Sequence, residues 1–164
     1  NFNVVLDACV LYDSHLRDLL LRLAEKELYQ PIWSSVICDE VKRNLEKRIT
    51  SDKANYLILT MNSAFPEAVI DDFSKLPKIE EERINEKDRH VLSAAISTNA
   101  EVMVTNNLKD FPNDILIEYN IETQYKKNTG SFYTSMDLTK IFWNELLEKI
   151  TKEEADRLIK EDSV

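Results

Sequence analysis

The sequence is poor in the residue types that bind zinc or cross-link small domains. It has two cysteines, Cys9 and Cys38, and two histidines among 164 residues. The cysteines form no CxxC pair and no histidine stands at a zinc-binding spacing, so neither a structural zinc site nor a disulfide framework is indicated. We expect both cysteines to be buried as small hydrophobic side chains.

Long apolar segments are also absent. No apolar run approaches the roughly 18 residues of a membrane span, and no charged and then apolar leader precedes the first predicted strand. The sequence shows no internal repeat and no low-complexity run. These features predict a cytosolic protein that does not associate with a membrane.

Basic residues are scarce relative to acidic ones. The chain has 21 Lys and Arg against 30 Asp and Glu, a net charge of −9. This balance argues against a broad basic face for nucleic acid, because phosphate binding normally recruits clustered Lys and Arg. Part of the negative charge could instead come from carboxylates that bind a metal ion. Charge alone therefore favours a protein or small-molecule partner over RNA.

Strand and helix patterns alternate along most of the chain. Short apolar runs are typical of buried strands, and they occupy residues 4–7, 31–33, 68–70 and 102–106. Apolar residues recur with helical period between them, in residues 16–28, 36–45, 55–63 and 91–96. This alternation predicts crossover connections and an α/β fold, a three-layer α/β/α sandwich around a parallel sheet.

The last part of the chain has a different character. Its loop-like stretch holds the only glycine, Gly130, and apolar residues of helical period run from Ser135 to about Ile150. We expect residues 1–125 to form the sheet domain. We expect residues 126–164 to form a helical extension that packs on that domain or on a partner.

Four acidic residues come where the predicted elements begin or end: Asp7, Glu40, Asp88 and Asp110. Ligands of parallel sheets bind beyond the carboxyl ends of the strands. We expect Asp7, Asp88 and Asp110 at that rim, and Glu40, about one turn into its helix, to reach it from the side. Hard divalent cations such as Mg²⁺ prefer oxygen ligands and activate bound water. The pattern therefore indicates a metal-dependent hydrolase.

Each acidic residue alone also has a simpler explanation. Asp110 fits a turn, Asp88 fits the cap of its helix, and Glu40 fits a solvated helix position. Asp7 is harder to explain in this way, because a carboxylate that closes a buried strand needs a partner. The two histidines have no evident partner, although His90, close to Asp88, could orient a neighbouring group.

The segments around the four acids share a joint pattern. They are VLDACVLY at 5–12, WS at 33–34, DEV at 39–41, NL at 44–45, DRHVLSAA at 88–95 and VTNNLKDFP at 104–112. Together they resemble the motifs of PIN domains, most closely those of VapC-type toxins of prokaryotic toxin–antitoxin modules. The resemblance covers about residues 3–124. Residues 16–24 and 65–68 resemble the subgroup with a helical extension, whereas residues 119–131 depart from the common pattern.

The resemblance implies a Mg²⁺- or Mn²⁺-dependent endoribonuclease, with RNA as substrate and a cognate antitoxin protein as partner. In that family the acidic quartet, here Asp7, Glu40, Asp88 and Asp110, holds one or two ions and orients the attacking water. Asn106 would fix Asp7 or the scissile phosphate, and Thr105 would hydrogen-bond the same carboxylates. Alternatively, Thr105 and Asn106 form only a turn that caps the strand. A homodimer is a further family expectation.

RNA would have to approach an acidic molecule through a local basic rim. Six basic residues come from the two helices that flank the predicted cleft: Arg17, Arg22, Lys42, Arg43, Lys47 and Arg48. Solvated helix faces are the alternative explanation for these side chains. Tyr12 and Trp33 are expected to be core or rim aromatics.

Three other classes can be compared with this interpretation. A phosphoacceptor receiver domain needs an acidic pair after the first strand, but only Asp7 stands there, while Asp71 and Asp72 follow the third. A haloacid-dehalogenase-type phosphatase needs Asp-x-Asp, and Cys9 occupies the second place. A PIN-like module without catalysis would use its acidic cleft to receive an Arg or Lys from a protein partner. The presence of all four carboxylates favours the enzyme.

Overall fold

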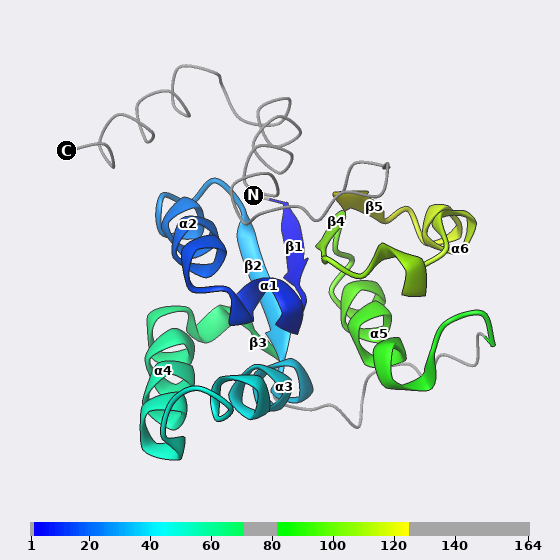
Figure 1. Ribbon diagram of the computed structural model, residues 1–164. Helices are drawn as coiled ribbons and strands as arrows, with labels where there is room; N and C mark the ends of the chain where they lie inside the picture. The colour runs from blue at the N-terminus through cyan, green and yellow to red at the C-terminus, as the bar shows by residue number, and fades with distance from the viewer. Residues whose placement is uncertain (1, 71–81, 125–164) are drawn as a thin grey trace. The chain divides into compact units, whose positions relative to one another are not determined.

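A computed structural model describes residues 2–70 and 82–124 of the chain (Figure 1). The chain divides into two units, residues 1–123 and 124–164. The predicted domain boundary after residue 125 stays a prediction. The predicted helical extension and the pair Asp71 and Asp72 lie outside the described residues.

Within the described residues, the sheet contains five strands in the order β3-β2-β1-β4-β5. The strands are β1 (Asn3–Leu6), β2 (Gln30–Ser34), β3 (Val69–Ile70), β4 (Val102–Val104) and β5 (Glu122–Gln124). β1 lies parallel to β2 and to β4, with Val5 opposite Ile32 and Met103, and β2 lies parallel to β3. The four predicted strands are confirmed, and β5 is additional.

Six α-helices connect these strands in the described part of the chain. They are α1 (Ala8–Tyr12), α2 (Ser14–Glu25), α3 (Ser35–Leu45), α4 (Ser51–Ala64), α5 (Arg89–Ser97) and α6 (Asn113–Glu118). The four predicted helices correspond to α2, α3, α4 and α5. α4 begins earlier than predicted because the Thr50 hydroxyl accepts a hydrogen bond from the Lys53 N–H at 3.4 Å. The short α1 and α6 were not predicted.

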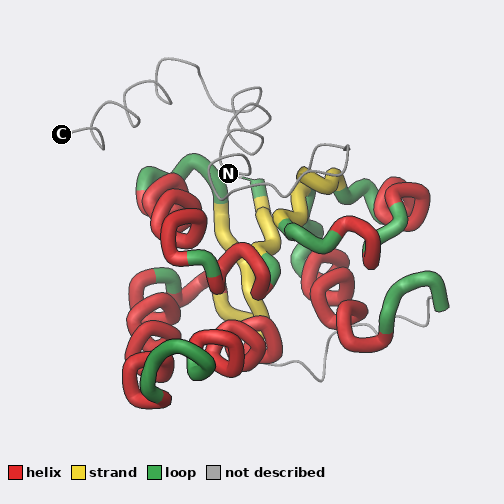
Figure 2. Tube along the Cα trace, in the orientation of Figure 1, coloured by secondary structure: helices red, strands yellow, loops and turns green. Residues whose placement is uncertain are grey.

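The helices cover both faces of the sheet. The chain runs from β1 through β2 to β3 in one direction and then returns across the sheet to β4. Right-handed crossovers therefore place α1 to α4 on one face and α5 on the other. α1 contacts α2 and α3, α3 contacts α4, and α5 packs against β1 and β2. Figure 2 shows the strands between these helices, which confirms the α/β/α prediction.

The central strands are buried on both faces. Val4, Val5 and Leu6 have no exposed surface, and Val102 and Met103 are at most 1% exposed. Such strands read as continuous apolar runs because helices cover each face. Trp33 is likewise fully buried, and its ring N–H donates to Asn62 Oδ1 at 2.9 Å, which confirms it as a core aromatic. The first polar residues after β1 and β4 are thus placed at the carboxyl-terminal edge of a rigid core.

None of the helices within residues 2–70 and 82–124 has the length and apolar character needed to cross a membrane.

Candidate active site

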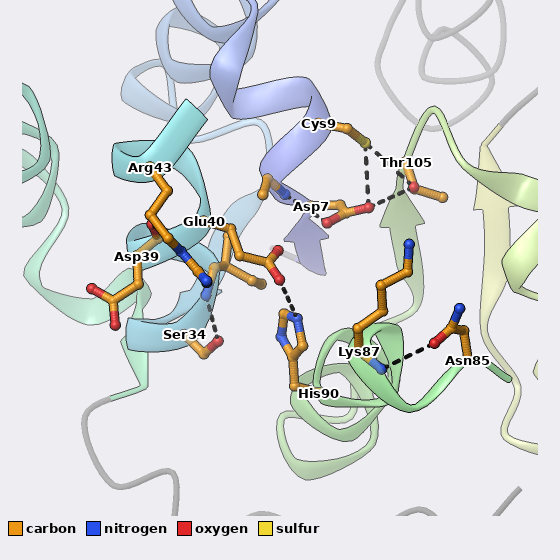
Figure 3. Close-up of polar contacts among 12 residues, drawn as sticks. Asp7, Cys9, Ser34, Asp39, Glu40, Arg43, Asn85, Lys87, His90 and Thr105 are labelled. Carbon is orange, nitrogen blue, oxygen red and sulfur yellow. Dashed lines mark hydrogen bonds and ion pairs between the residues drawn. The ribbon is translucent and has the colours of Figure 1, made fainter. Parts of the chain in front are cut away.

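Asp7 and Thr105 join the ends of the two central strands. The Asp7 N–H donates to the Val104 carbonyl at 3.1 Å, and the Thr105 hydroxyl donates to Asp7 Oδ2 at 2.6 Å (Figure 3). Asp7 Oδ1 accepts from the Ala8 N–H at 2.6 Å, which caps α1. Because Asp7 is only 8% exposed, these bonds supply the partners that a buried carboxylate requires.

Cys9 extends this network. Its thiol donates to Asp7 Oδ2 at 3.3 Å and accepts from the Asn106 N–H at 3.1 Å. Burial and the neighbouring Asp7 charge raise the pKa of Cys9 to about 12, so the sulfur keeps its hydrogen as a donor. The prediction of a purely hydrophobic Cys9 was wrong, since this half-buried side chain is part of a polar cluster. Cys38 is buried as predicted.

Asn106 meets this cluster through its main chain. Its residue is exposed, and the hydrogen bond that it gives to Cys9 comes from the backbone. The bond to the Asp7 carboxylate that was considered for Asn106 is made by Thr105 instead. Asn107, which the sequence did not single out, supplies its N–H to the Thr105 hydroxyl at 3.0 Å and its side-chain amide to Asp110 Oδ2.

Asp88 ends a 3-10 turn, Glu86–Asp88, directly before α5. The interpretation of Asp88 as only a helix cap is wrong, because its side chain makes no capping hydrogen bond. Burial raises the pKa of Asp88, the nearby Lys87 ammonium opposes this increase, and the charges of Asp110, Asp7 and Glu40 add to it. The fold therefore brings the other three predicted carboxylates within electrostatic range of Asp88.

One oxygen of Asp88 has no partner. Within residues 2–70 and 82–124, the buried side-chain oxygen and nitrogen atoms without a hydrogen bond are Asp88 Oδ2 and His90 Nδ1. A buried carboxylate oxygen that makes no hydrogen bond is costly unless a cation or a ligand approaches it. Asp88 thus has the free lone pairs that Asp7 lacks at Oδ2.

Glu40 reaches the site from α3, on which its side chain is 29% exposed. Its Oε1 lies 3.2 Å from Nε2 of His90, a residue of α5 that is 9% exposed. Figure 3 shows the imidazole directed toward the Glu40 carboxylate. The interpretation of Glu40 as a merely solvated helix residue is therefore wrong. No partner of His90 was predicted, because Glu40 and His90 are 50 positions apart in the chain.

Asp110 ends a second 3-10 turn, Leu108–Asp110. Its N–H donates to the Asn107 carbonyl at 3.1 Å, and its carboxylate accepts from the Asn107 amide. The predicted turn is confirmed, and the same turn directs a carboxylate close enough to Asp88 to raise its pKa.

The carboxylates do not form a finished metal cage. In the described part of the chain, no group of three or more His, Cys, Asp or Glu side chains is arranged so that it could hold a metal ion. Mg²⁺ keeps several waters and is commonly bound through one or two carboxylates plus substrate phosphates. The oxygen donor set and the unpartnered Asp88 Oδ2 fit such a loosely held hard cation.

The six basic residues expected to form the rim are engaged to different degrees. Arg17 donates to the Leu11 carbonyl at 2.8 Å and so holds the end of α1. Arg22 lies 2.9 Å from Asp18, and Lys42 lies 4.0 Å from Glu46. Arg48 lies over the ring of Tyr12, 5.2 Å from its centroid. Lys87, not singled out from the sequence, extends from its turn toward Asp7 and Thr105 (Figure 3). Its ammonium also opposes the rise in the pKa of Asp88, one member of the acidic cluster formed by Asp7, Glu40, Asp88 and Asp110.

Known proteins resemble parts of this chain. A family model described as PIN domain matches residues 3–109. A protein of Mycobacterium tuberculosis that is named as a candidate ribonuclease, VapC50, is 61% identical over 36 residues. That similarity spans 22% of this chain and 21% of the relative, about a fifth of its length. No solved structure matches the chain significantly. Because the family model matches more than half of the chain, the chain belongs to the PIN domain family.

Proposed function

We propose that the chain is an endoribonuclease that uses Mg²⁺ or Mn²⁺ and is the toxin component of a type II toxin–antitoxin system. The PIN domain match and the similarity to a relative that is named as a candidate ribonuclease support RNA as the substrate. A cognate antitoxin is proposed as the protein partner, and homodimerisation stays a prediction.

The observation that carries this proposal is the environment of Asp88. Its carboxylate lies near three others that raise its pKa, and its buried Oδ2 has no hydrogen-bond donor among the described residues. Such an environment opposes the ionised carboxylate in the free protein and favours it once a cation is present. Asp7, Glu40, Asp88 and Asp110 are therefore the proposed ligands.

When bound, a divalent cation supplies Lewis acidity and lowers the pKa of its water, which permits phosphodiester hydrolysis at neutral pH. The chain's own residues prepare the site for this chemistry. Thr105 and the Ala8 N–H fix the orientation of Asp7, and Asn107 fixes Asp110. Lys87 provides a positive charge toward the cluster that can contact a backbone phosphate.

The test is incubation of the purified protein with a mixed cellular RNA pool, with Mn²⁺, with Mg²⁺ and with a chelator. Asp88→Asn is the inactive variant, and Asp39→Asn is the matched control. Asp39 is exposed and next to Glu40, so its substitution removes the same charge outside the proposed site. We expect metal-dependent cuts from the wild type and from Asp39→Asn, and none from Asp88→Asn.

The opposite result would change the assignment. If the wild type cuts no RNA and calorimetry detects no uptake of Mn²⁺, the chain is a PIN-like binding module. Its acidic cleft would then receive a basic side chain from a protein partner.

A further inference from the structure

The contact between Glu40 and His90 connects the two helices that carry proposed ligands. Glu40 belongs to α3, whereas His90 lies in the first turn of α5, two residues after Asp88. α3 and α5 lie on opposite faces of the sheet. The contact between Glu40 and His90 joins them beyond the carboxyl ends of the strands. We propose that His90 is a positioning residue, which holds the Glu40 carboxylate toward the other three acids. This inference rests on the proposed function.

The chemistry of the contact determines its direction. An ionised carboxylate can only accept hydrogen bonds, so the hydrogen between the two residues is carried by Nε2 of His90. The bond uses Oε1 of Glu40 and leaves Oε2 for a ligand. Hydrogen bonds from a second residue commonly fix the orientation of ligating side chains, and their loss weakens metal binding.

The burial of His90 explains why the contact can fix a flexible side chain. A glutamate has several rotatable bonds and loses conformational freedom when it is held in one orientation. The imidazole is 9% exposed, and its neighbours Val91 and Leu92 are at most 1% exposed. The ring is thus a fixed donor, whereas a solvated lysine or arginine would move with its partner.

The other ring nitrogen argues against a purely structural role. Nδ1 is buried and has no hydrogen-bond partner within the described ranges. An unsatisfied buried nitrogen destabilises the fold, and an apolar side chain of similar size would avoid this cost. A histidine at this position therefore lowers the stability of the fold, but it orients a carboxylate of the proposed site.

Two substitutions separate these roles. His90→Gln keeps an amide N–H at about the reach of Nε2, whereas His90→Met has similar bulk and no donor. We expect His90→Met to bind Mn²⁺ about 10- to 100-fold more weakly in calorimetry. We expect His90→Gln to retain most of the affinity. His90→Met should unfold at a urea concentration no lower than that of the wild type. It removes the unpartnered Nδ1, and the Glu40 carboxylate, which is 29% exposed, can be hydrated instead.

A double-mutant cycle identifies the route of the effect. If His90 acts through Glu40, His90→Met should change Mn²⁺ affinity little in a Glu40→Gln background. His15→Met is the matched control, because His15 is an exposed histidine of α2. It should bind Mn²⁺ and cut RNA as the wild type does.

The outcomes are distinguishable. A wild type that takes up no Mn²⁺ overturns the proposed function and this inference with it. If the wild type and His90→Met bind Mn²⁺ equally tightly, the inference is overturned and the proposed function is not. A full effect of His90→Met that persists in the Glu40→Gln background also overturns it, as does an equal loss of affinity and stability in both His90 variants.

Discussion

Asp7 and Asp88 belong to the same acidic cluster, but they differ in the hydrogen bonds that the surrounding chain donates to their carboxylates. Asp7 follows a buried strand and accepts hydrogen bonds from Thr105, Cys9 and the Ala8 N–H. Asp88 follows a 3-10 turn, and its Oδ2 accepts none within the described residues. The Asp7 carboxylate is thus part of the hydrogen-bonded core, whereas the Asp88 carboxylate needs a cation or a ligand as its partner.

This difference separates stability from function within one site. Hydrogen bonds made by Asp7 tie the end of β1 to the end of β4. At Asp88 burial and three carboxylates act against the charged form. Substitution of either residue by Asn should therefore abolish cleavage. The free energy of unfolding should fall for the Asp7 variant and stay the same or rise for the Asp88 variant.

The largest expected effect is the loss of cleavage in Asp88→Asn. The change removes a proposed ligand, so RNA cleavage should fall by at least about 100-fold, beyond the usual cost of losing a residue that only orients a ligand. The urea midpoint should stay the same or rise, because the repulsion by Asp110, Asp7 and Glu40 is relieved. Cleavage at the wild-type rate would remove Asp88 from the site.

Asp7→Asn should lose cleavage to a similar extent but also lose stability. Its new amide N–H groups would face the Thr105 hydroxyl and the Cys9 thiol, which donate to the native carboxylate. We expect the free energy of unfolding to fall by about 1–3 kcal/mol, measured by urea denaturation beside Asp88→Asn. Equal midpoints for the two variants would contradict the difference drawn between these residues.

Thr105→Val tests the bond that orients Asp7. The substitution keeps the shape of the side chain and removes the hydroxyl that donates to Asp7 Oδ2 and accepts from the Asn107 N–H. Stability should fall by about 1–2 kcal/mol, and cleavage by about 10-fold. Thr105→Ser keeps the hydroxyl and is the control. If the two variants cleave equally well, the orientation of Asp7 does not depend on this bond.

The smallest effect is expected for Arg48→Met, outside the acidic cluster. Arg48 lies over Tyr12, which ends the helix that begins directly after Asp7. Stability should change by only about 0.5–1 kcal/mol. RNA binding should weaken for all RNA sequences. The slope of log affinity against log salt concentration should fall by about one, as expected for the loss of one phosphate contact. Lys26→Met is the control. Lys26 caps the end of α2, shortly before β2 begins. Identical salt slopes for the two variants would exclude Arg48 from the RNA-binding surface.

Much of the fold could be predicted because its signals are local. Apolar runs marked β1, β2, β3 and β4, and helical periodicity marked α2, α3, α4 and α5. The start of α4 was misplaced, since a capping hydroxyl has little influence on the apolar pattern. The helices α1 and α6 have 5 and 6 residues, too few for a period to be recognised.

The candidate site was predicted as a set of residues but without its internal contacts. Asp7, Thr105 and Asp110 lie at strand or turn ends, which apolar runs and turn residues locate. Cys9 was misassigned, Asn107 was missed and the partner of His90 was not predicted, because each acts through a hydrogen bond that local composition does not reveal.

The sequence by itself determined where the buried strands end, which carboxylates follow them and which family the motifs resemble. Only the tertiary structure decided the partners of these carboxylates. Thr105 meets Asp7 across 98 positions and His90 meets Glu40 across 50, because the chain returns over the sheet and places β4 beside β1. Such contacts depend on the strand order and on the packing of helices on both faces, which local periodicity does not specify.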